Sequence, residues 1–265
     1  MNVTILIPAR FASSRYPGKP LVDLKGATGT AKPLIQRSVE AARRIPGVSS
    51  VFVTTDDERI AEACRDFGAV SIMTSPACRN GTERCAEALA QLGDVDLVIN
   101  FQGDALLTPP GFVTALIDHM AANPDAMVAT PAMRQRASEV RALQADEAAG
   151  RVGGTSVVTG NDGHALYFSK KLIPYLPKGA IDGELTPVRL HIGVYAYRPQ
   201  ALDTYAVTPV SELEELEGLE QLRFLAAGIP IDVVEVETPS FTLRELNNPE
   251  DVAPIEAALA AAGLE

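Results

Sequence analysis

The chain has 265 residues and a formal net charge of −11, from 23 Lys+Arg and 34 Asp+Glu, and 46% of its residues are hydrophobic. This size allows one large α/β domain or two small ones, and the apolar content suffices for a buried core without a sign of intrinsic disorder. The acidic balance excludes a general positive field, so we expect no binding to nucleic acid or to an anionic membrane surface.

Targeting, membrane and cysteine signals are sparse. No apolar run approaches the roughly 20 residues that cross a bilayer. Met1 leads directly into the run Val3–Ile7 without a basic region or a small-residue cleavage site, and we therefore expect a cytoplasmic protein. Cys64, Cys78 and Cys85 form no CxxC pair, which argues against a disulfide scaffold and against a Cys/His zinc site.

The first hundred residues alternate between short β-branched runs and longer helical patterns, which predicts repeated βαβ units around a parallel sheet. Helices are expected after Pro33, around Ile60 and Cys64, from near Thr82, and over Pro110–Met120, with Cys64 on a buried helix face. The predicted strands are Val3–Ile7, Val51–Thr55, Val70–Met73, Leu97–Phe101 and Met127–Thr130.

The pattern changes in the second half of the chain. Periodicity breaks down from about Arg134 to Gly154, and Asn161-Asp162-Gly163 is then a turn signal between two apolar runs, which predicts a hairpin. The further predicted elements are hairpin strands Thr155–Thr159 and Ala165–Ser169, a strand His191–Tyr197, a helix capped by Ser211 that runs to Gly228, a strand Ile231–Val236, and a C-terminal helix with Asn248 as N-cap and Pro249 as its first residue.

The chain shows no internal repeat, low-complexity tract or long linker. We therefore expect a single domain over residues 1–265, with an inserted subdomain at roughly 134–210.

The most informative segment is the loop over residues 8–20, which follows the first predicted strand. Such loops at the carboxyl ends of parallel strands form the ligand crevice of open α/β sheets. Arg10, Arg15 and Lys19 lie within ten residues, together with two hydroxyls and Gly18, a composition suited to a triphosphate. The plain alternative is a solvated loop with surface charges. A P-loop GxxxxGK[ST] and a GxGxxG are both missing from the sequence, which disfavours an ordinary P-loop NTPase or a dinucleotide oxidoreductase.

This loop and five later segments resemble the 3-deoxy-manno-octulosonate (Kdo) cytidylyltransferases, also called CMP-Kdo synthetases, in the same order through nearly the whole chain. The resemblance implies an α/β, Rossmann-like nucleotidyltransferase fold with a mostly parallel central sheet and a smaller dimerisation subdomain. It also implies a homodimer, Mg²⁺ dependence, and transfer of CMP from CTP to an acidic sugar. The segments are 8–21, Gly81-Thr82-Glu83-Arg84, Gln102-Gly103-Asp104, 165–169, 191–195 and 219–223.

The same resemblance implies roles for individual residues. Arg10, Arg15 and Lys19 would hold the phosphates of CTP and neutralise the leaving pyrophosphate, and Asp104 would hold Mg²⁺ together with Asn247. The implied nucleotide-binding residues are Pro8, Ala9, Arg10, Ser14, Arg15, Lys19, Thr82, Arg84 and Gln102, and the implied acceptor-binding residues are Gln102, Lys170, His191, Tyr195, Glu220 and Gln221.

Each of these residues also has a plainer explanation. Asp104 could be a turn residue, His191 and Tyr195 half-buried strand residues, and Glu220 a solvated charge on a helix.

Several positions depart from the family's pattern. Ala105 stands where the family usually has Glu, Asn247 where it has Asp, Lys170 where it has Arg, and Ser156 where it has Lys. Ala77-Cys78 replaces Asp-His, and the turn over residues 26–32 is about four residues longer than usual. These changes lie on the acceptor and metal sides, so the nucleotide prediction is the more secure. Asparagine oxygen can still coordinate Mg²⁺.

The leading hypothesis is therefore a Mg²⁺-dependent cytidylyltransferase that releases pyrophosphate, with Kdo as the default acceptor. Two alternatives stay open. In the first, the acceptor is another acid, such as an amino-substituted Kdo, another 2-keto sugar acid or a phosphonate. In the second, the chain is a nucleotide-binding homologue that has lost catalysis.

Overall fold

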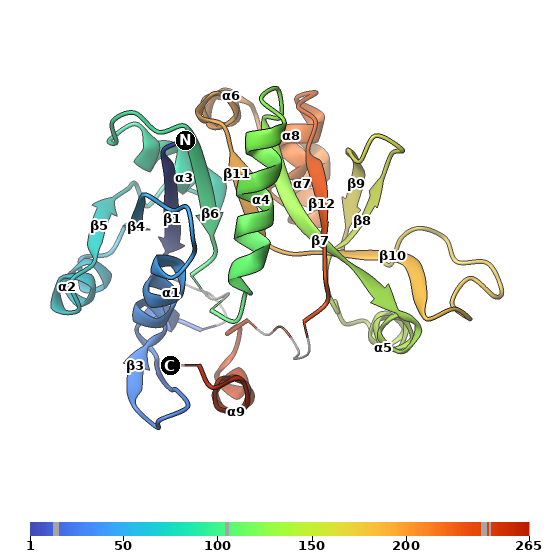
Figure 1. Cartoon of the computed structure of the whole chain (residues 1–265), viewed down its shortest axis with the longest axis horizontal. Coiled ribbons are helices and arrows are strands. Elements are labelled where there is room, and N and C mark those ends of the chain that lie inside the picture. Colours follow the sequence, from blue (N-terminus) through green and yellow to red (C-terminus); the bar gives the residue numbers. More distant parts are fainter. Residues whose placement is uncertain (13–15, 104–105, 240–242, 244, 265) are drawn as a thin grey trace.

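The computed structural model describes residues 1–12, 16–103, 106–239, 243 and 245–264 (Figure 1). The first half of the chain forms four parallel strands. In it, β1 (Val3–Ala9) lies between β4 (Ser50–Thr55) and β6 (Leu97–Phe101), and β5 (Val70–Met73) pairs with β4. Successive residues of β1 from Ile5 to Ile7 are fully buried, as expected for a sheet that is covered on both faces. The first four of the five strands predicted for the parallel sheet are confirmed.

Helices cover both faces of these strands. The apolar residues of α1 (Leu34–Arg43), α2 (Glu58–Asp66) and α4 (Pro110–Ala122) join one buried cluster, and those of α3 (Gly81–Leu89) join the cluster on the opposite face. Each helix lies where the apolar spacing predicts it. Cys64 is fully buried in the first cluster, which confirms its role in core packing.

The second half of the chain continues the same sheet with mostly antiparallel pairs. The strand order over the described residues is β5-β4-β1-β6-β11-β7-β10-β8-β9, and β12 pairs in parallel with β7. The predicted hairpin is confirmed as β8 and β9. The bounds are β7 (Val128–Arg136), β8 (Ser156–Thr159), β9 (Ala165–Ser169), β10 (Leu185–His191), β11 (Val194–Tyr197) and β12 (Asp232–Val236). The fifth strand predicted for the parallel sheet, Met127–Thr130, forms as β7, but the parallel pairing expected for it holds only toward β12, since β7 pairs antiparallel with β10 and β11.

The predicted continuous strand His191–Tyr197 is wrong. The chain leaves β10 at His191 and enters β11 at Val194, because residues before the break pair with β7 and β8, whereas residues after it pair with β6 and β7. At the break, the N–H of Ile192 donates to the carbonyl of Pro131 and the N–H of Val194 donates to that of Ile192.

Two helical predictions also differ from the structure. Residues 137–148, where no periodicity is visible, form α5 (Ala137–Ala148), whose first turn is capped by the Glu139 carboxylate at the N–H of Arg136. The single helix predicted from Ser211 to Gly228 is wrong. It is divided into α7 (Glu212–Glu217) and α8 (Leu222–Ala226) at Gly218, which adopts φ +60°. The turn between them carries Glu220 and Gln221 toward the carboxyl ends of the parallel strands.

The C-terminal part packs under the edge of the first half. Asn248 caps the turn η2 (Pro249–Asp251), as predicted, and α9 (Val252–Ala262) follows it. A third buried cluster joins α9 to Leu24 of the small pair β2 (Asp23–Lys25) and β3 (Ala31–Pro33), and includes Leu106 and Leu246.

The remaining elements are η1 (Lys19–Leu21) and α6 (Pro199–Val207). None of the helices in the described part of the chain has the length and apolar character needed to traverse a membrane. The division into a core and an inserted subdomain at 134–210 stays a prediction.

Candidate functional site

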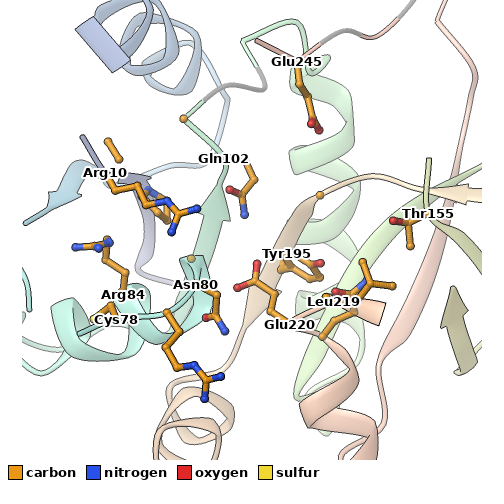
Figure 2. A pocket seen from close by; sticks show the side chains of 18 of the residues that line it. Arg10, Cys78, Asn80, Arg84, Gln102, Thr155, Tyr195, Leu219, Glu220 and Glu245 are labelled. Carbon is orange, nitrogen blue, oxygen red and sulfur yellow. The ribbon is translucent and has the colours of Figure 1, made fainter. Parts of the chain in front are cut away.

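A cavity of about 940 Å³ lies at the carboxyl ends of β1 and β6, where the parallel and antiparallel halves of the sheet meet (Figure 2). This is the place where open α/β sheets bind ligands. Eleven of the predicted site residues line it, namely Pro8, Ala9, Arg10, Lys19, Arg84, Gln102, His191, Tyr195, Glu220, Gln221 and Asn247. Thr82 and Lys170 do not, and Ser14, Arg15 and Asp104 lie outside the described residues.

The first wall of the cavity contains the cations that follow β1. Arg10 and Lys19 line it, and Arg10 is exposed. The loop between them is closed by a hydrogen bond from the N–H of Gly18 to the carbonyl of Phe11. Gly18 has φ +72°, and a Cβ there would lie 3.1 Å from the Phe11 ring, so a larger residue would strain this turn.

Arg84 is only 3% exposed, and its guanidinium is held beneath this wall. It donates to the hydroxyl of Thr74 at 2.5 Å and pairs with Asp56 at 3.0 Å. These contacts orient Arg84 at the floor of the cavity. Thr82 lies deeper, fully buried, and its hydroxyl is 2.9 Å from that of Tyr197.

The N-terminus of α3 points into the middle of the cavity. Asn80 caps it by accepting the N–H of Glu83 at 2.8 Å, and the N–H of Thr82 donates to the Glu220 carboxylate at 2.9 Å. Burial raises the pKa of Glu220, while the bonds from Thr82 oppose the rise. Glu220 is therefore not the freely solvated charge of the plainer explanation. Gly81 permits this close packing, since a Cβ there would lie 3.2 Å from Nε2 of Gln102.

His191 belongs to the second wall and is neutral. The hydroxyl of Thr130 donates to the carbonyl of Val194 at 2.8 Å, so it accepts from Nε2–H of His191 at 2.9 Å. Nδ1 is then left as a hydrogen-bond acceptor. Burial lowers the pKa of His191 to about 3, and its ring packs against Phe168 and Tyr195.

Tyr195 and Gln221 complete the second wall. Tyr195 is 3% exposed, and burial raises the pKa of its hydroxyl. Gln221 is 2% exposed, and its Nε2 finds no hydrogen-bond partner among the described residues although the side chain lines the cavity. Because a buried amide without a partner is costly, this group is suited to a ligand oxygen. Lys170 lies behind this wall, with Nζ 2.8 Å from the position of a Cβ on Gly218.

A buried ion network joins the walls. Arg223 pairs with Glu214 at 2.6 Å and with Glu83 at 2.8 Å, and its guanidinium lies 4.1 Å from the centre of the Tyr205 ring. It thereby holds α3, α7 and α8 together around Glu220.

The last wall comes from the segment before η2. Asn247 lines the cavity, as predicted for a metal-side residue, and its Nδ2 is 3.4 Å from Oε2 of Glu245. No group of three or more His, Cys, Asp or Glu side chains arranged to hold a metal is present among the residues that the structure describes.

Seven cavity residues with polar side chains are not among the predicted site residues. Two of them had a detectable signal: Asn80 is a cap residue next to a predicted helix start, and Glu245 lies two residues before Asn247 in a stretch with no helical pattern. The other five had none, because they meet the cavity only when the chain has folded. The seven are Cys78, Arg79, Asn80, Thr155, Glu214, Glu215 and Glu245.

The chain belongs to the cytidylyltransferase family, whose model matches residues 4–233. It is 40% identical over 264 residues to the 3-deoxy-manno-octulosonate cytidylyltransferase of Maricaulis maris, with 99% of each chain covered. It is also 39% identical over 263 residues to the 8-amino-3,8-dideoxy-manno-octulosonate cytidylyltransferase of Shewanella sediminis, with 98% of this chain and 99% of the relative covered.

A solved structure of CMP:2-keto-3-deoxy-manno-octonic acid synthetase complexed with CTP has a TM-score of 0.84 to this chain at 35% identity. It covers 99% of this chain and 100% of the other. These comparisons confirm the predicted enzyme class and the predicted α/β nucleotidyltransferase fold.

Proposed function

We propose that this cytidylyltransferase transfers CMP from CTP to a Kdo-type sugar acid in a Mg²⁺-dependent reaction and releases pyrophosphate. Kdo is the default acceptor, and its 8-amino analogue is the alternative, since relatives named for both are similarly close to the chain. The observation that carries the proposal is one continuous cavity with a cationic wall after β1 and a hydrogen-bonding wall on β10, β11 and the α7–α8 turn.

The first wall acts on the nucleotide. Arg10 and Lys19 bring positive charge to the triphosphate and stabilise the charge that builds on pyrophosphate as it leaves. The acceptor hydroxyl gives up its proton to solvent and forms a new bond to the α-phosphorus, while the bond from that phosphorus to the bridging oxygen of the leaving pyrophosphate breaks. Arg15 belongs to the same proposed group.

The second wall positions the acceptor. Nδ1 of His191 accepts a hydrogen bond from an acceptor hydroxyl, and the unpartnered amide of Gln221 donates to an acceptor oxygen. Because His191 is neutral, this wall orients the sugar by hydrogen bonds and holds the attacking hydroxyl in line. Lys170, behind the α7–α8 turn, stays a predicted acceptor-side residue.

The oxygen-bearing side chains of the cavity fit a Mg²⁺ ion that takes its remaining ligands from the nucleotide. Glu245 and Asn247, whose side chains carry oxygen atoms, line the cavity, and the described residues form no complete protein cage. This is the usual arrangement for Mg²⁺, which takes one or two protein oxygens and completes its shell with substrate phosphates and water. When bound, the ion would neutralise phosphate charge, and Asn247 with Asp104 are its proposed ligands.

The proposal extends to assembly and location. Large apolar side chains on and beside β8, β9 and β10 are exposed, among them Leu166 at 66%, Tyr175 at 88% and Leu185 at 58%. Such a surface suits contact with a second copy of the chain, so we propose a homodimer through this region. A cytoplasmic location stays a prediction.

Pyrophosphate release from CTP, measured with Kdo, 8-amino-Kdo, other 2-keto sugar acids and a phosphonate, tests the function. The expected result is release with Kdo or its amino analogue and none without Mg²⁺. Release with only another acid would overturn the acceptor assignment. If CTP raises the melting temperature while no acceptor yields pyrophosphate, the chain is a silent nucleotide-binding homologue, and the proposed catalysis is wrong.

A further inference from the structure

The segment that leads into η2 presents two oxygen-bearing side chains to the cavity. Glu245 and Asn247 line it, while Leu246 between them is fully buried in the opposite direction, packed in a cluster with Leu106 and Leu107. This alternation places the carboxylate and the carboxamide on one side of the segment. Their side chains are adjacent, with Nδ2 of Asn247 3.4 Å from Oε2 of Glu245.

The segment is held by its own cap. The N–H groups of Asn247 and Asn248 donate to Oδ2 of Asp251 at 2.9 and 2.7 Å, and Leu246 anchors it to the buried cluster. These contacts fix the backbone that bears Asn247 and directly follows Glu245, and a metal site benefits from such a fixed support. The same cluster contains Leu106, so this segment packs beside the chain that follows β6.

Three other described carboxylates line the cavity on the side of α7 and the α7–α8 turn. Glu214 is held by Arg223 at 2.6 Å, Glu220 accepts the N–H of Thr82, and Glu215 of α7 lies 3.7 Å from Arg79. Glu245 is on another wall. In Figure 2 it points into the cavity from the side opposite Arg10 and Arg84, with Gln102 between, so a triphosphate held by Arg10 would lie between cations and this carboxylate.

We propose that Glu245 is a ligand of the divalent cation that accompanies CTP, acting beside Asn247. An amide at position 247 offers Mg²⁺ an oxygen without a negative charge, and the neighbouring carboxylate supplies that charge. The proposal rests on the proposed function, since it needs CTP and a divalent cation in this cavity. It assigns a residue of this chain that the family resemblance does not.

The test measures Mn²⁺ binding to the protein–CTP complex by electron paramagnetic resonance without an acceptor, so that no turnover occurs. Glu245→Gln keeps the shape of the side chain and removes its charge. We expect it to weaken Mn²⁺ binding about tenfold, the scale at which supporting groups of metal sites act. CTP binding in EDTA, followed by calorimetry, should stay unchanged. In the double variant Glu245→Gln/Asn247→Asp, Mn²⁺ affinity should return.

Glu237→Gln is the matched control, because it removes one exposed charge from the same inter-element stretch without touching the cavity. Its Mn²⁺ affinity should equal that of the unchanged protein. The inference is overturned if Glu245→Gln binds Mn²⁺ as the unchanged protein does. Failure of the unchanged protein to bind CTP would instead overturn the proposed function, so the two outcomes are distinct.

Discussion

At the scale of single residues, burial decides what each side chain of the acceptor wall can do. Burial lowers the pKa of His191 to about 3, so the ring is neutral near neutral pH, and burial raises the pKa of the Tyr195 hydroxyl. Glu220 remains in place because the first turn of α3 donates to it. The wall therefore offers its ligand the neutral side chains of His191 and Tyr195 beside the carboxyl group of Glu220.

The pKa of His191 predicts a dependence of stability on pH. The pKa of His191 falls from 6.5 to about 3 on folding. At a pH between these two values, His191 is therefore protonated in the unfolded chain and neutral in the folded chain. Stability should therefore decrease as pH falls below 6.5, by up to about 1.4 kcal/mol per pH unit from this group. In His191→Gln this contribution is lost. Urea unfolding of both proteins between pH 7 and pH 4 should show their difference in unfolding free energy changing with pH, and a constant difference would contradict the prediction.

Gly103 is a second residue whose role can be tested. A Cβ there would lie 2.9 Å from the backbone carbonyl oxygen of Pro8, closer than real contacts allow. Gly103→Ala should force β1 and the end of β6 apart, destabilise the chain by about 1–3 kcal/mol and reduce CTP binding. Gly93→Ala, where nothing lies within 4 Å, is the control. Equal melting temperatures for the two variants would refute this expectation.

At the scale of elements, the sequence predicts those helices and strands whose formation depends on residues that are close together in the chain. The strands of the first half are apolar on both faces, and α2 and α3 begin at Asp57 and Asn80, which accept N–H groups of their first turns. In α5 the apolar periodicity is missing, because only Val140 is buried, and the cap by Glu139 alone does not reveal the helix. The break at Gly193 depends on which strands the flanking residues pair with. Gly218 is a C-cap glycine in the left-handed conformation, a signal that the apolar periodicity running past it obscures.

Loss of the α3 cap should affect both stability and the site. Asn80 accepts the N–H of Glu83 and donates to the hydroxyl of Tyr205 at 2.9 Å. Asn80→Ala should cost about 1 kcal/mol of unfolding free energy from the cap. It should also raise the KM for the acceptor, because the same turn holds Glu220. Asn80→Ser keeps a capping oxygen and should recover most of the stability in denaturant titrations. If the serine variant is as unstable as the alanine variant, the cap is not the cause.

At the scale of the whole molecule, the site joins segments that lie far apart in the chain. The loop after β1 could be identified from its cations, since they are close in sequence. The meeting of Arg10, Glu220 and Glu245 in one cavity depends on the strand order and on the divided α7–α8 helix, which no local pattern encodes. For this reason most residues of the second wall were predicted from the family resemblance and not from local patterns. Glu245 was not among these predicted residues.

Arg223 connects the walls and provides a test at this scale. It is 3% exposed and neutralises Glu214 and Glu83, so its removal leaves two carboxylates uncompensated, one of them buried. Arg223→Met should destabilise the chain by about 3–5 kcal/mol. Adding Glu214→Gln to this variant should restore part of the loss. Equilibrium unfolding of the single and double variants measures both, and a double variant less stable than the single one would rule out charge burial as the reason.

The position of β6 has a consequence for how such enzymes diverge. It pairs in parallel with β1 on one side and antiparallel with β11 on the other, so the boundary between the two kinds of pairing runs through the cavity. Most of the proposed triphosphate wall and most of the proposed acceptor wall therefore come from separate stretches of the polypeptide. Ser156 and Lys170, which depart from the family, both fall in the second stretch. In chimaeras that exchange only this second stretch between relatives, we expect the acceptor sugar to change while the proposed phosphate-binding residues stay the same.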